Sequence, residues 1–195
     1  MSKTKTIDLT SGPILKTLAE LALPIMASSL LGTAYNITDM AWIGMLGSKA
    51  VAGVGVGGMY VWLSQGLVAL PRMGGQVNVA QACGRGDYEQ ARGYAASALR
   101  LTFLLGILFA AVCIVFIHPL LGFFNLGDAE TYTAAKLYTL ITCGLILFSF
   151  LNLTLTGLST AQGDSKTPLM ANLLGLVGNM ILDPILILGF GPFPR

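Results

Sequence analysis

Five long apolar segments, separated by short polar connections, dominate the pattern of the chain. They cover residues 14–43, 50–82, 94–117, 132–160 and 168–190. Each is longer than the roughly 20 helical residues that cross the hydrocarbon core of a bilayer. The pattern therefore predicts an all-α polytopic membrane protein with five transmembrane helices. Because the first, second and fourth segments are much longer than a bilayer requires, we expect them to tilt, kink or project beyond it.

The composition agrees with a membrane location. Hydrophobic residues make up 54 % of the 195 residues and charged residues only 10 %, whereas a soluble domain carries about a quarter charged residues. The net charge of +2 is too small to indicate a nucleic-acid partner. The three cysteines lie far apart without the spacing of a metal site, so we interpret them as packing residues.

Basic residues indicate the orientation of the chain in the membrane. Those of the N-terminal segment and of the connections after the second and fourth spans fall on one side, which the positive-inside rule makes cytoplasmic. We therefore expect a multi-pass protein of the cell membrane with a cytoplasmic leader over residues 1–13, the spans over 14–190 and an extracytoplasmic end over 191–195. Since the chain stops straight after a span, we expect it to be a truncated part of a longer protein. The basic residues are Lys3, Lys5, Arg85, Arg92 and Lys166.

Two aspartates lie inside the first and fifth spans, where a charged side chain is costly and by default indicates a functional site. Asp39 follows Tyr35 by four residues, and Asp183 follows Asn179 by four, so each pair shares one helix face. Both spans run from inside to outside, which places the two carboxyl groups at similar depth. If the two faces meet, the four side chains form one polar cluster that binds a proton or Na⁺, with Asp39, Asn179 and Asp183 as Na⁺ ligands. The alternative is a structural polar contact between two helices.

Each of the two spans that carry these aspartates also contains a proline. Pro184 removes the amide that would bond the Met180 carbonyl, and Pro24 does the same to the carbonyl of Glu20. We interpret both as hinges. Arg72 follows Pro71 about ten residues before the cytoplasmic end of the second span, where it snorkels, projects past the bilayer or has a function.

Two further patterns favour structural roles. Residues 53–58 satisfy the G-x-G-x-x-G pattern of dinucleotide sites, but no strand precedes them, and Gly53 and Gly57 also form the G-x-x-x-G pattern of close helix packing. We predict packing. His118, the only histidine, precedes Pro119 at the outer end of the third span, which favours an interfacial structural role over a proton relay.

Six stretches of the chain carry a resemblance to one family: Leu23-Pro24, Tyr35-Asn-Ile-Thr-Asp39, Trp42-Ile-Gly44-Met-Leu-Gly47, residues 81–92, residues 162–168 and Asn179-Met-Ile-Leu-Asp183-Pro184. Over essentially its whole length, the chain resembles the multidrug and toxic compound extrusion (MATE) transporters. The resemblance implies a transporter of twelve helices in two six-helix lobes, with this chain supplying helices one to five of the N-terminal lobe. The sixth helix and the second lobe are then missing partners. In the family, residues matching Tyr35, Asp39, Asn179 and Asp183 are implicated in cation coupling.

We therefore expect part of a secondary active antiporter that exports amphipathic or cationic organic compounds in exchange for H⁺ or Na⁺, with no cofactor. Two alternatives remain open, a related lipid-linked precursor flippase and a non-transporting scaffold or half-size subunit. We do not expect an enzyme, because no constellation for nucleophilic or metal catalysis lies within a span. Candidate wall residues for the substrate are Tyr60, Trp62, Tyr138, Asn152 and Thr156.

Overall fold

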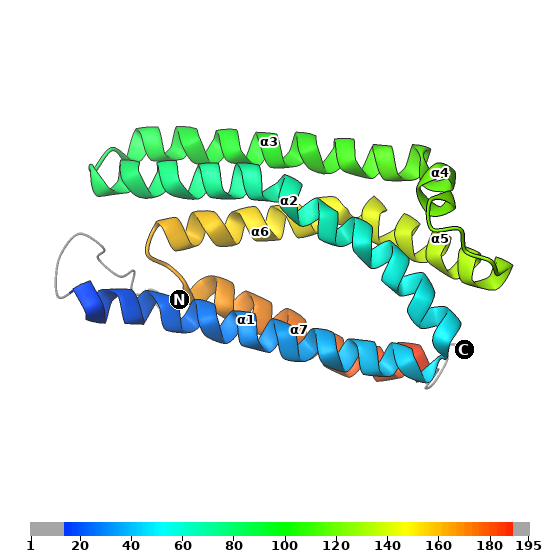
Figure 1. The fold of residues 1–195 in the computed structure, drawn as a ribbon. Helices are drawn as coiled ribbons and strands as arrows, with labels where there is room; N and C mark the ends of the chain where they lie inside the picture. Colours follow the sequence, from blue (N-terminus) through cyan, green and yellow to red (C-terminus); the bar gives the residue numbers. More distant parts are fainter. Residues whose placement is uncertain (1–13, 189–195) are drawn as a thin grey trace. The chain divides into compact units, whose positions relative to one another are not determined.

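The computed structural model describes residues 14–188 and contains helices and turns but no strand in that part of the chain (Figure 1). The predicted leader over 1–13 and the predicted end over 191–195 lie outside the described residues. The helices form two compact units. The first holds α1 (Ile14–Met45) and α7 (Lys166–Leu188). The second holds α2 (Ser48–Gly84), α3 (Tyr88–Val115), α4 (Ile117–Gly122), α5 (Ala129–Gly144) and most of α6 (Ile146–Ala161).

The helices follow the predicted spans closely. Among the described residues, α1, α2 and α3 are each long and apolar enough to cross a membrane, and α5 with α6 makes a fourth span if the bent pair counts as one. That pair is broken at Leu145 and bent by 45°, a kink of the kind that the length of the fourth segment led us to expect. Gly144, directly before the break, has the low helix propensity that favours it. The fifth predicted span coincides with α7 up to Leu188, where the described residues end, although α7 is not among the helices that are long and apolar enough by the same measure.

Close packing of glycine joins α2 to α5 in the second unit. A Cβ atom on Gly53 would lie 3.0 Å from the Cβ of Ala134, and one on Gly57 would overlap the ring of Tyr138. Both glycines are buried. The prediction that they serve helix packing is confirmed, since a larger side chain would force the two helices apart.

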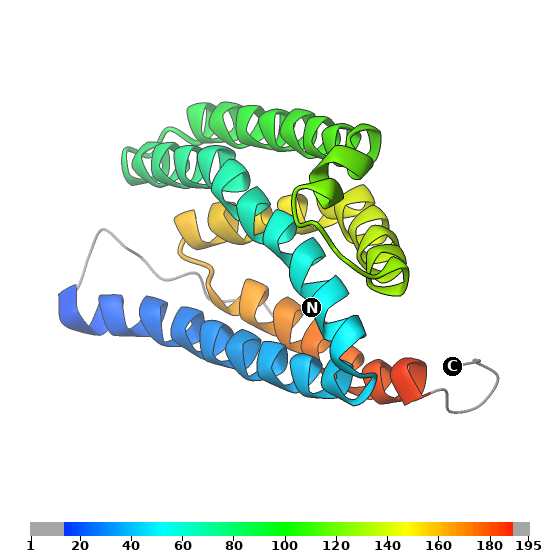
Figure 2. The same ribbon diagram turned by 45° about the vertical axis from the view of Figure 1, so that its right-hand side comes forward.

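The α2–α3 hairpin is a second close contact, and the two helices run side by side in both views (Figures 1 and 2). Gly86 turns the chain with a φ of 75°, a value that favours glycine. Asp87 then caps α3 by accepting a hydrogen bond of 2.9 Å from the Gln90 amide. This cap explains why the helix begins at Tyr88, six residues before the predicted span.

The core of the second unit lies where α2, α3 and α6 meet. Val68, Ile146 and Phe150 are at most 2 % exposed and form one cluster. Beside it, the hydroxyl groups of Thr102 and Thr154 lie 2.9 Å apart and are fully buried. Buried hydroxyl groups need partners, and this pair satisfies them between α3 and α6.

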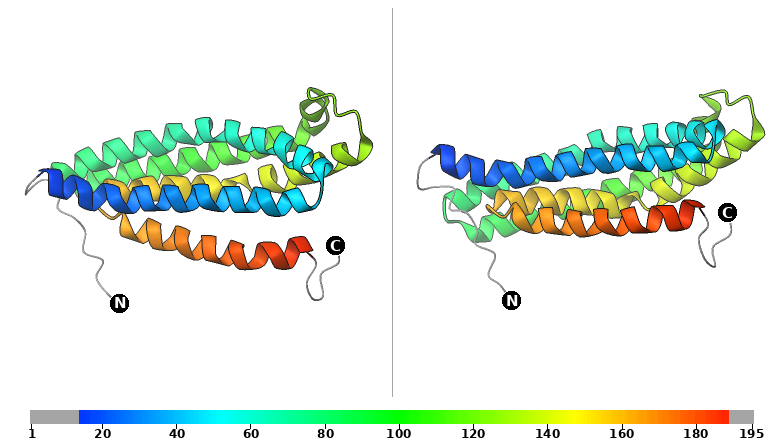
Figure 3. Two further views of the ribbon diagram at one scale, coloured as in Figure 1. Left: turned by 60° about the horizontal axis from the view of Figure 1, so that its bottom comes forward. Right: turned by 90° about the horizontal axis from the view of Figure 1, so that it is seen from below.

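The opposite end of the second unit is tied together by charges. The short helix α4 and a connection lead the chain from α3 back into α5 (Figure 3). Asp128 caps α5 through the amide and hydroxyl of Thr131, and Lys49 lies 3.3 Å from Asp128 and 2.6 Å from Glu130. Thr131 and then Lys49 hold the pKa of the Asp128 carboxyl below its usual value. These contacts bring the first turns of α2 and α5 together.

Candidate functional site

The candidate site lies in the first unit, where α1 and α7 pack against each other. The two helices run alongside each other over much of their length (Figures 2 and 3). Within α1, Pro24 interrupts the backbone ladder, and the hydroxyl groups of Ser29, Thr33 and Thr38 each donate to the carbonyl four residues earlier. Bonds of this kind compete with the backbone ladder and allow a helix to bend. The part of α1 between Pro24 and Asp39 is therefore locally adaptable.

The start of α7 is set by its own cap. Gly163 has a φ of 80°, and the Asp164 carboxylate accepts from the amides of Lys166 at 3.2 Å and Thr167 at 3.0 Å. Partial burial acts to raise the pKa of Asp164, but the hydrogen bonds from Thr167 and Lys166 outweigh it and hold the pKa below its usual value. The cap fixes where α7 begins, and so which residues lie on the face that carries Asn179 and Asp183.

The structure brings the four predicted polar side chains together. Asn179 donates a hydrogen bond of 3.3 Å from Nδ2 to the hydroxyl of Tyr35. That hydroxyl also lies close to the side chain of Asp183, and Asp183 lies close enough to Asp39 for the two charges to repel. The Tyr–Asp and Asn–Asp pairs therefore lie level with each other on the two facing helices, at the similar depth that we expected for the two carboxyl groups.

The electrostatics of this cluster favour the uptake of a positive charge. Tyr35, Asp39 and Asp183 are partly buried, and within the described residues neither carboxylate forms an ion pair with a lysine or arginine. Like charges held close together repel, and partial burial strengthens the repulsion. A proton on one carboxylate, or a cation between the two, removes it.

The donor atoms also bear on which cation could bind. The cluster offers carboxylate, amide and phenol oxygens, the ligand type that hard cations prefer. No group of three histidine, cysteine, aspartate or glutamate side chains that could hold a metal ion occurs among the described residues. A donor set made of oxygen atoms suits a proton or a hard cation such as Na⁺.

Both prolines of the hinge interpretation lie inside helices. Pro24 lies inside α1, fifteen residues before Asp39, and Pro184 follows Asp183 directly within α7. The Pro184 side chain lies outside the described residues. Because proline has no amide proton, the carbonyl of Met180 loses its usual helical partner next to the polar cluster.

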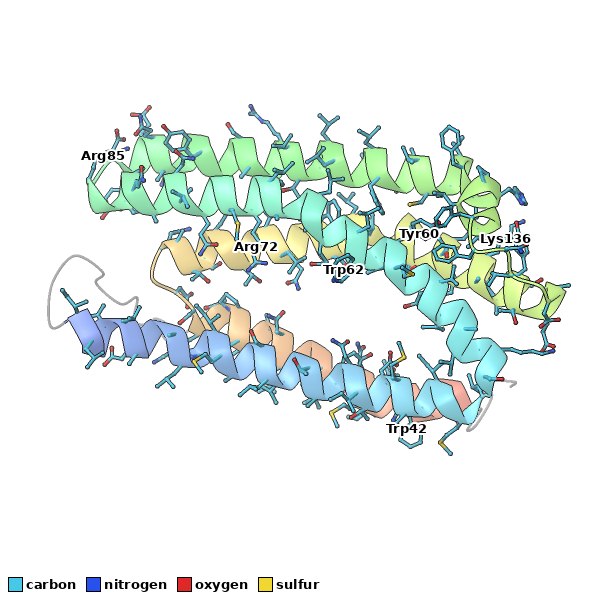
Figure 4. The ribbon with its side chains drawn as sticks, viewed as in Figure 1. Trp42, Tyr60, Trp62, Arg72, Arg85 and Lys136 are labelled. Atoms are coloured by element: carbon cyan, nitrogen blue, oxygen red, sulfur yellow. The ribbon has the colours of Figure 1, made fainter. Side chains whose placement is uncertain are left out.

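The predicted wall residues do not form one surface. Tyr60 and Trp62 both line an apolar cavity of about 590 Å³ in the second unit, between α2, the end of α3 and α4 (Figure 4). The Tyr60 hydroxyl donates to the Leu120 carbonyl at 2.6 Å, which is a structural contact. Tyr138 instead packs under Gly57 in the seam with α2. The remaining two, Asn152 and Thr156, are on α6 and are not among the residues that line the cavity.

Other polar residues have structural partners, some of which the sequence reasoning missed. His118 Nδ1 lies 2.8 Å from the Tyr132 hydroxyl, and the rings stack, in line with an interfacial structural role. The contact of Lys49 with Glu130 was not predicted, because 81 residues separate the partners. Arg100 on α3 was also overlooked. Its signal was available, since it lies as far after the α2–α3 turn as Arg72 lies before it.

Comparison with known proteins gives one consistent result. The model of the MatE family matches residues 24–185. A relative from Shewanella oneidensis, named FAD transporter, is 28 % identical over 96 % of this chain and 41 % of its own length. The probable multidrug resistance protein NorM of Thermotoga maritima is 29 % identical over 93 % of this chain and 39 % of its own length.

Solved structures agree with these relatives. One described as the outward-facing conformation of a multidrug resistance MATE family transporter matches with a TM-score of 0.83 at 28 % identity. The match covers 98 % of this chain and 43 % of that one. The chain thus spans about two fifths of the length of the proteins it matches.

Proposed function

Because the chain belongs to the MatE family of transporters, we propose that it is the N-terminal part of a secondary active antiporter of the cell membrane. It exports amphipathic or cationic organic compounds in exchange for H⁺ or Na⁺, and its N-terminus is cytoplasmic. The observation that carries this proposal is the cluster of Asp39 and Asp183 with the hydrogen-bonded pair Tyr35 and Asn179. The remaining helices of a two-lobe transporter come from sequence outside this chain.

The coupling ion acts on the contact between α1 and α7. While both carboxylates are charged, their repulsion pushes Asp39 and Asp183 apart. A proton or Na⁺ cancels that repulsion and lets the two helix faces approach. An ion drives transport only through its different affinity for the two states, and here the states differ in the distance between the carboxylates.

The prolines convert this local change into a change of helix shape. The carbonyls of Glu20 and Met180 lack their helical partners, so bending at Pro24 and Pro184 breaks no further backbone bond. Ion binding at Asp183 therefore bends α7 at Pro184, the residue that directly follows it. We propose that this bend reshapes the substrate cavity and expels its content outward.

The decisive test measures substrate efflux in cells that produce the full-length natural protein. Ethidium represents organic cations, and FAD is included because the Shewanella relative is named a transporter of it. Efflux is compared for the wild type, Asp39→Asn and Asp183→Asn at matched expression, with the H⁺ and Na⁺ gradients collapsed separately. We expect both variants to lose efflux and the wild type to respond to one gradient. Unchanged, gradient-dependent efflux in both variants refutes coupling at this cluster.

A further inference from the structure

The two arginines of the α2–α3 hairpin lie at the same height. Twelve residues separate Arg72 from Gly84 at the end of α2, and twelve separate Tyr88 at the start of α3 from Arg100. At 1.5 Å per residue, each arginine lies about 18 Å from the turn. In Figure 4, Arg85 marks the turn and Arg72 lies well along α2 from it.

Side-chain contacts confirm this antiparallel pairing. A Cβ atom on Gly75 would lie 2.6 Å from the Cβ of Ala98, and Leu105 packs against the cluster that contains Val68. Residues of α2 and α3 whose numbers add to about 173 are therefore level. By that rule Arg72 is level with residue 101, next to Arg100.

A band without charged side chains begins at this level. Residues 56–71 of α2 and 101–115 of α3 contain no lysine, arginine, aspartate or glutamate. On the α5–α6 side, residues 137–163 between Lys136 and Asp164 contain no charged side chain, and Gly157 lies within that stretch. Gly157 is level with Arg72, because a Cβ on it would lie 3.1 Å from the Cγ of Arg72.

The thickness of the band matches a bilayer. Ala134 faces Gly53 and Tyr138 faces Gly57, so Lys136 is level with residue 55 of α2. From there to Arg72 is seventeen residues, or about 26 Å. A hydrocarbon core is about 30 Å thick, so the charge-free band is close to one core thickness, and the hairpin beyond Arg72 is not needed to cross it.

The exposed surface of α3 changes character at the same place. Beyond Arg100 toward the turn, the exposed residues are small or polar apart from Tyr88; within the band, they are large and apolar apart from Ala111. On α2 the change is less sharp, since Met73 and Val77 are exposed beside Asn78 and Gln81. The exposed positions of α3 are Tyr88, Glu89, Gln90, Arg92, Gly93, Ala96, Ser97 and Arg100 on one side, then Leu101, Phe103, Leu104, Ile107, Leu108, Ala111, Val112, Ile114 and Val115 on the other.

We propose that the membrane-contacting surface of the second unit ends at Arg72 and Arg100, and that residues 73–99 project from the bilayer into the cytoplasm. The exposed guanidinium of Arg100 binds the phosphate groups of phospholipids in the cytoplasmic leaflet, a group that arginine recognises with two parallel hydrogen bonds. Arg72 is then a boundary residue and not a charge in the middle of the membrane. The side of the membrane on which the hairpin lies rests on the cytoplasmic N-terminus of the proposed function, but the position of the boundary does not.

The end of α6 supports this boundary. The helix continues for four residues after Gly157 and ends at Ala161, about 6 Å further on. The polar connection with Asp164 and Lys166 follows directly. The fourth span therefore reaches its polar connection within a few residues of Gly157, which is level with Arg72.

Thiol labelling tests the boundary on one helix. The full-length protein with Cys83→Ser receives either Ala96→Cys or Ala111→Cys, both at exposed positions of α3 and both the same chemical change. Cys113 and Cys143 stay in place because they are buried. A membrane-impermeant sulfonated maleimide is applied to inside-out vesicles, to right-side-out vesicles and to denatured protein, where every variant must react.

We expect Ala96→Cys to react in inside-out vesicles at least about tenfold faster than Ala111→Cys, because a thiol in hydrocarbon neither ionises readily nor meets the probe. Equal, slow labelling of both overturns the proposal, since the bilayer then covers the third span as far as residue 94. If Ala96→Cys is labelled only in right-side-out vesicles, the hairpin lies outside the cell and its proposed cytoplasmic location is wrong. Neither outcome depends on efflux, so the result is independent of the ion-coupling proposal.

The role of Arg100 is tested in the same background. Arg100→Leu removes the phosphate contact and should let the hairpin sink, which slows labelling of Ser97→Cys severalfold in inside-out vesicles. Arg100→Lys keeps a cation at this level and should preserve the rate. If Arg100→Leu leaves the rate of Ser97→Cys unchanged, Arg100 does not hold the hairpin at the lipid phosphates.

Discussion

The packing of α2 on α5 at Gly57 makes a sharp prediction about the smallest possible substitution. In Gly57→Ala, the added methyl group would overlap the ring of Tyr138 and lie 2.8 Å from the Oγ1 of Thr139, which is fully buried. Neither neighbour can withdraw without opening the seam between the two helices. Gly58→Ala is the matched control, because nothing lies within 4 Å of a Cβ atom there.

The expected size follows from two opposing effects. Overpacking costs about 1–3 kcal/mol in a close-packed interior, while alanine is about 1 kcal/mol more favourable than glycine inside a helix. Gly58→Ala gains only the higher helix propensity of alanine, whereas Gly57→Ala has the same gain together with the cost of overpacking. The two variants should therefore differ by about 1–3 kcal/mol in the free energy of unfolding, or roughly 5- to 150-fold in the ratio of folded to unfolded protein.

Thermal unfolding of the purified full-length protein in detergent measures this difference. The wild type, Gly57→Ala and Gly58→Ala are compared under the same conditions, with the buried cysteines as the sites of a thiol-reactive fluorescent dye. We expect Gly57→Ala to unfold at a lower temperature than the wild type and Gly58→Ala at an equal or higher one. If Gly57→Ala is at least as stable as Gly58→Ala, the close-packing interpretation of the α2–α5 seam is refuted.

Three further predictions concern single contacts. Because Thr102 also bonds the Ala98 carbonyl, Thr154→Val should cost less than Thr102→Val, and a double-mutant cycle should give a coupling of about 0.5–1.5 kcal/mol; additive effects would contradict a direct hydrogen bond. Asp164→Ala should destabilise α7 by about 0.5–2 kcal/mol near neutral pH. Since the pKa of Asp164 is lowered in the folded state, the cap contributes above its unfolded pKa and is lost as the pH falls through the folded pKa. The difference between wild type and variant in unfolding scans should thus shrink below about pH 4, and a constant difference down to pH 2 would contradict it. Lys49→Met should lower the stability only slightly, with the loss disappearing at high salt, because its carboxylate partners are exposed; a loss that salt leaves unchanged would argue against an ion pair.

The polar cluster was predictable in its parts because helix periodicity is a local property. The spacing of four residues between Tyr35 and Asp39, and between Asn179 and Asp183, is sufficient to place each pair on one face. That the two faces meet is a tertiary fact, which the spacing left as an assumption. The hydrogen bond between Asn179 and Tyr35 supports that assumption.

Other features depended on contacts that no local pattern specifies. The substrate-wall candidates were chosen by residue type, but Tyr138 packs in a helix seam while Trp62 lines a cavity. The interruption at Leu145 divides a segment whose hydropathy is continuous, so hydropathy alone could not locate the break. The early start of α3 depends on the Asp87 cap, a signal that was present in the sequence but that the apolar pattern outweighed.

The most direct test of the central claim measures ion and substrate movement together. The full-length protein is reconstituted into liposomes, an H⁺ or Na⁺ gradient is imposed, and uptake of an organic cation is recorded with the counterflow of the ion. Asp183→Asn is compared with Asp164→Asn, which makes the same chemical change outside the spans and keeps a capping side chain. We predict that the wild type and Asp164→Asn couple the two fluxes and that Asp183→Asn abolishes both. Coupled fluxes of normal size in Asp183→Asn would contradict ion coupling at the α1–α7 cluster.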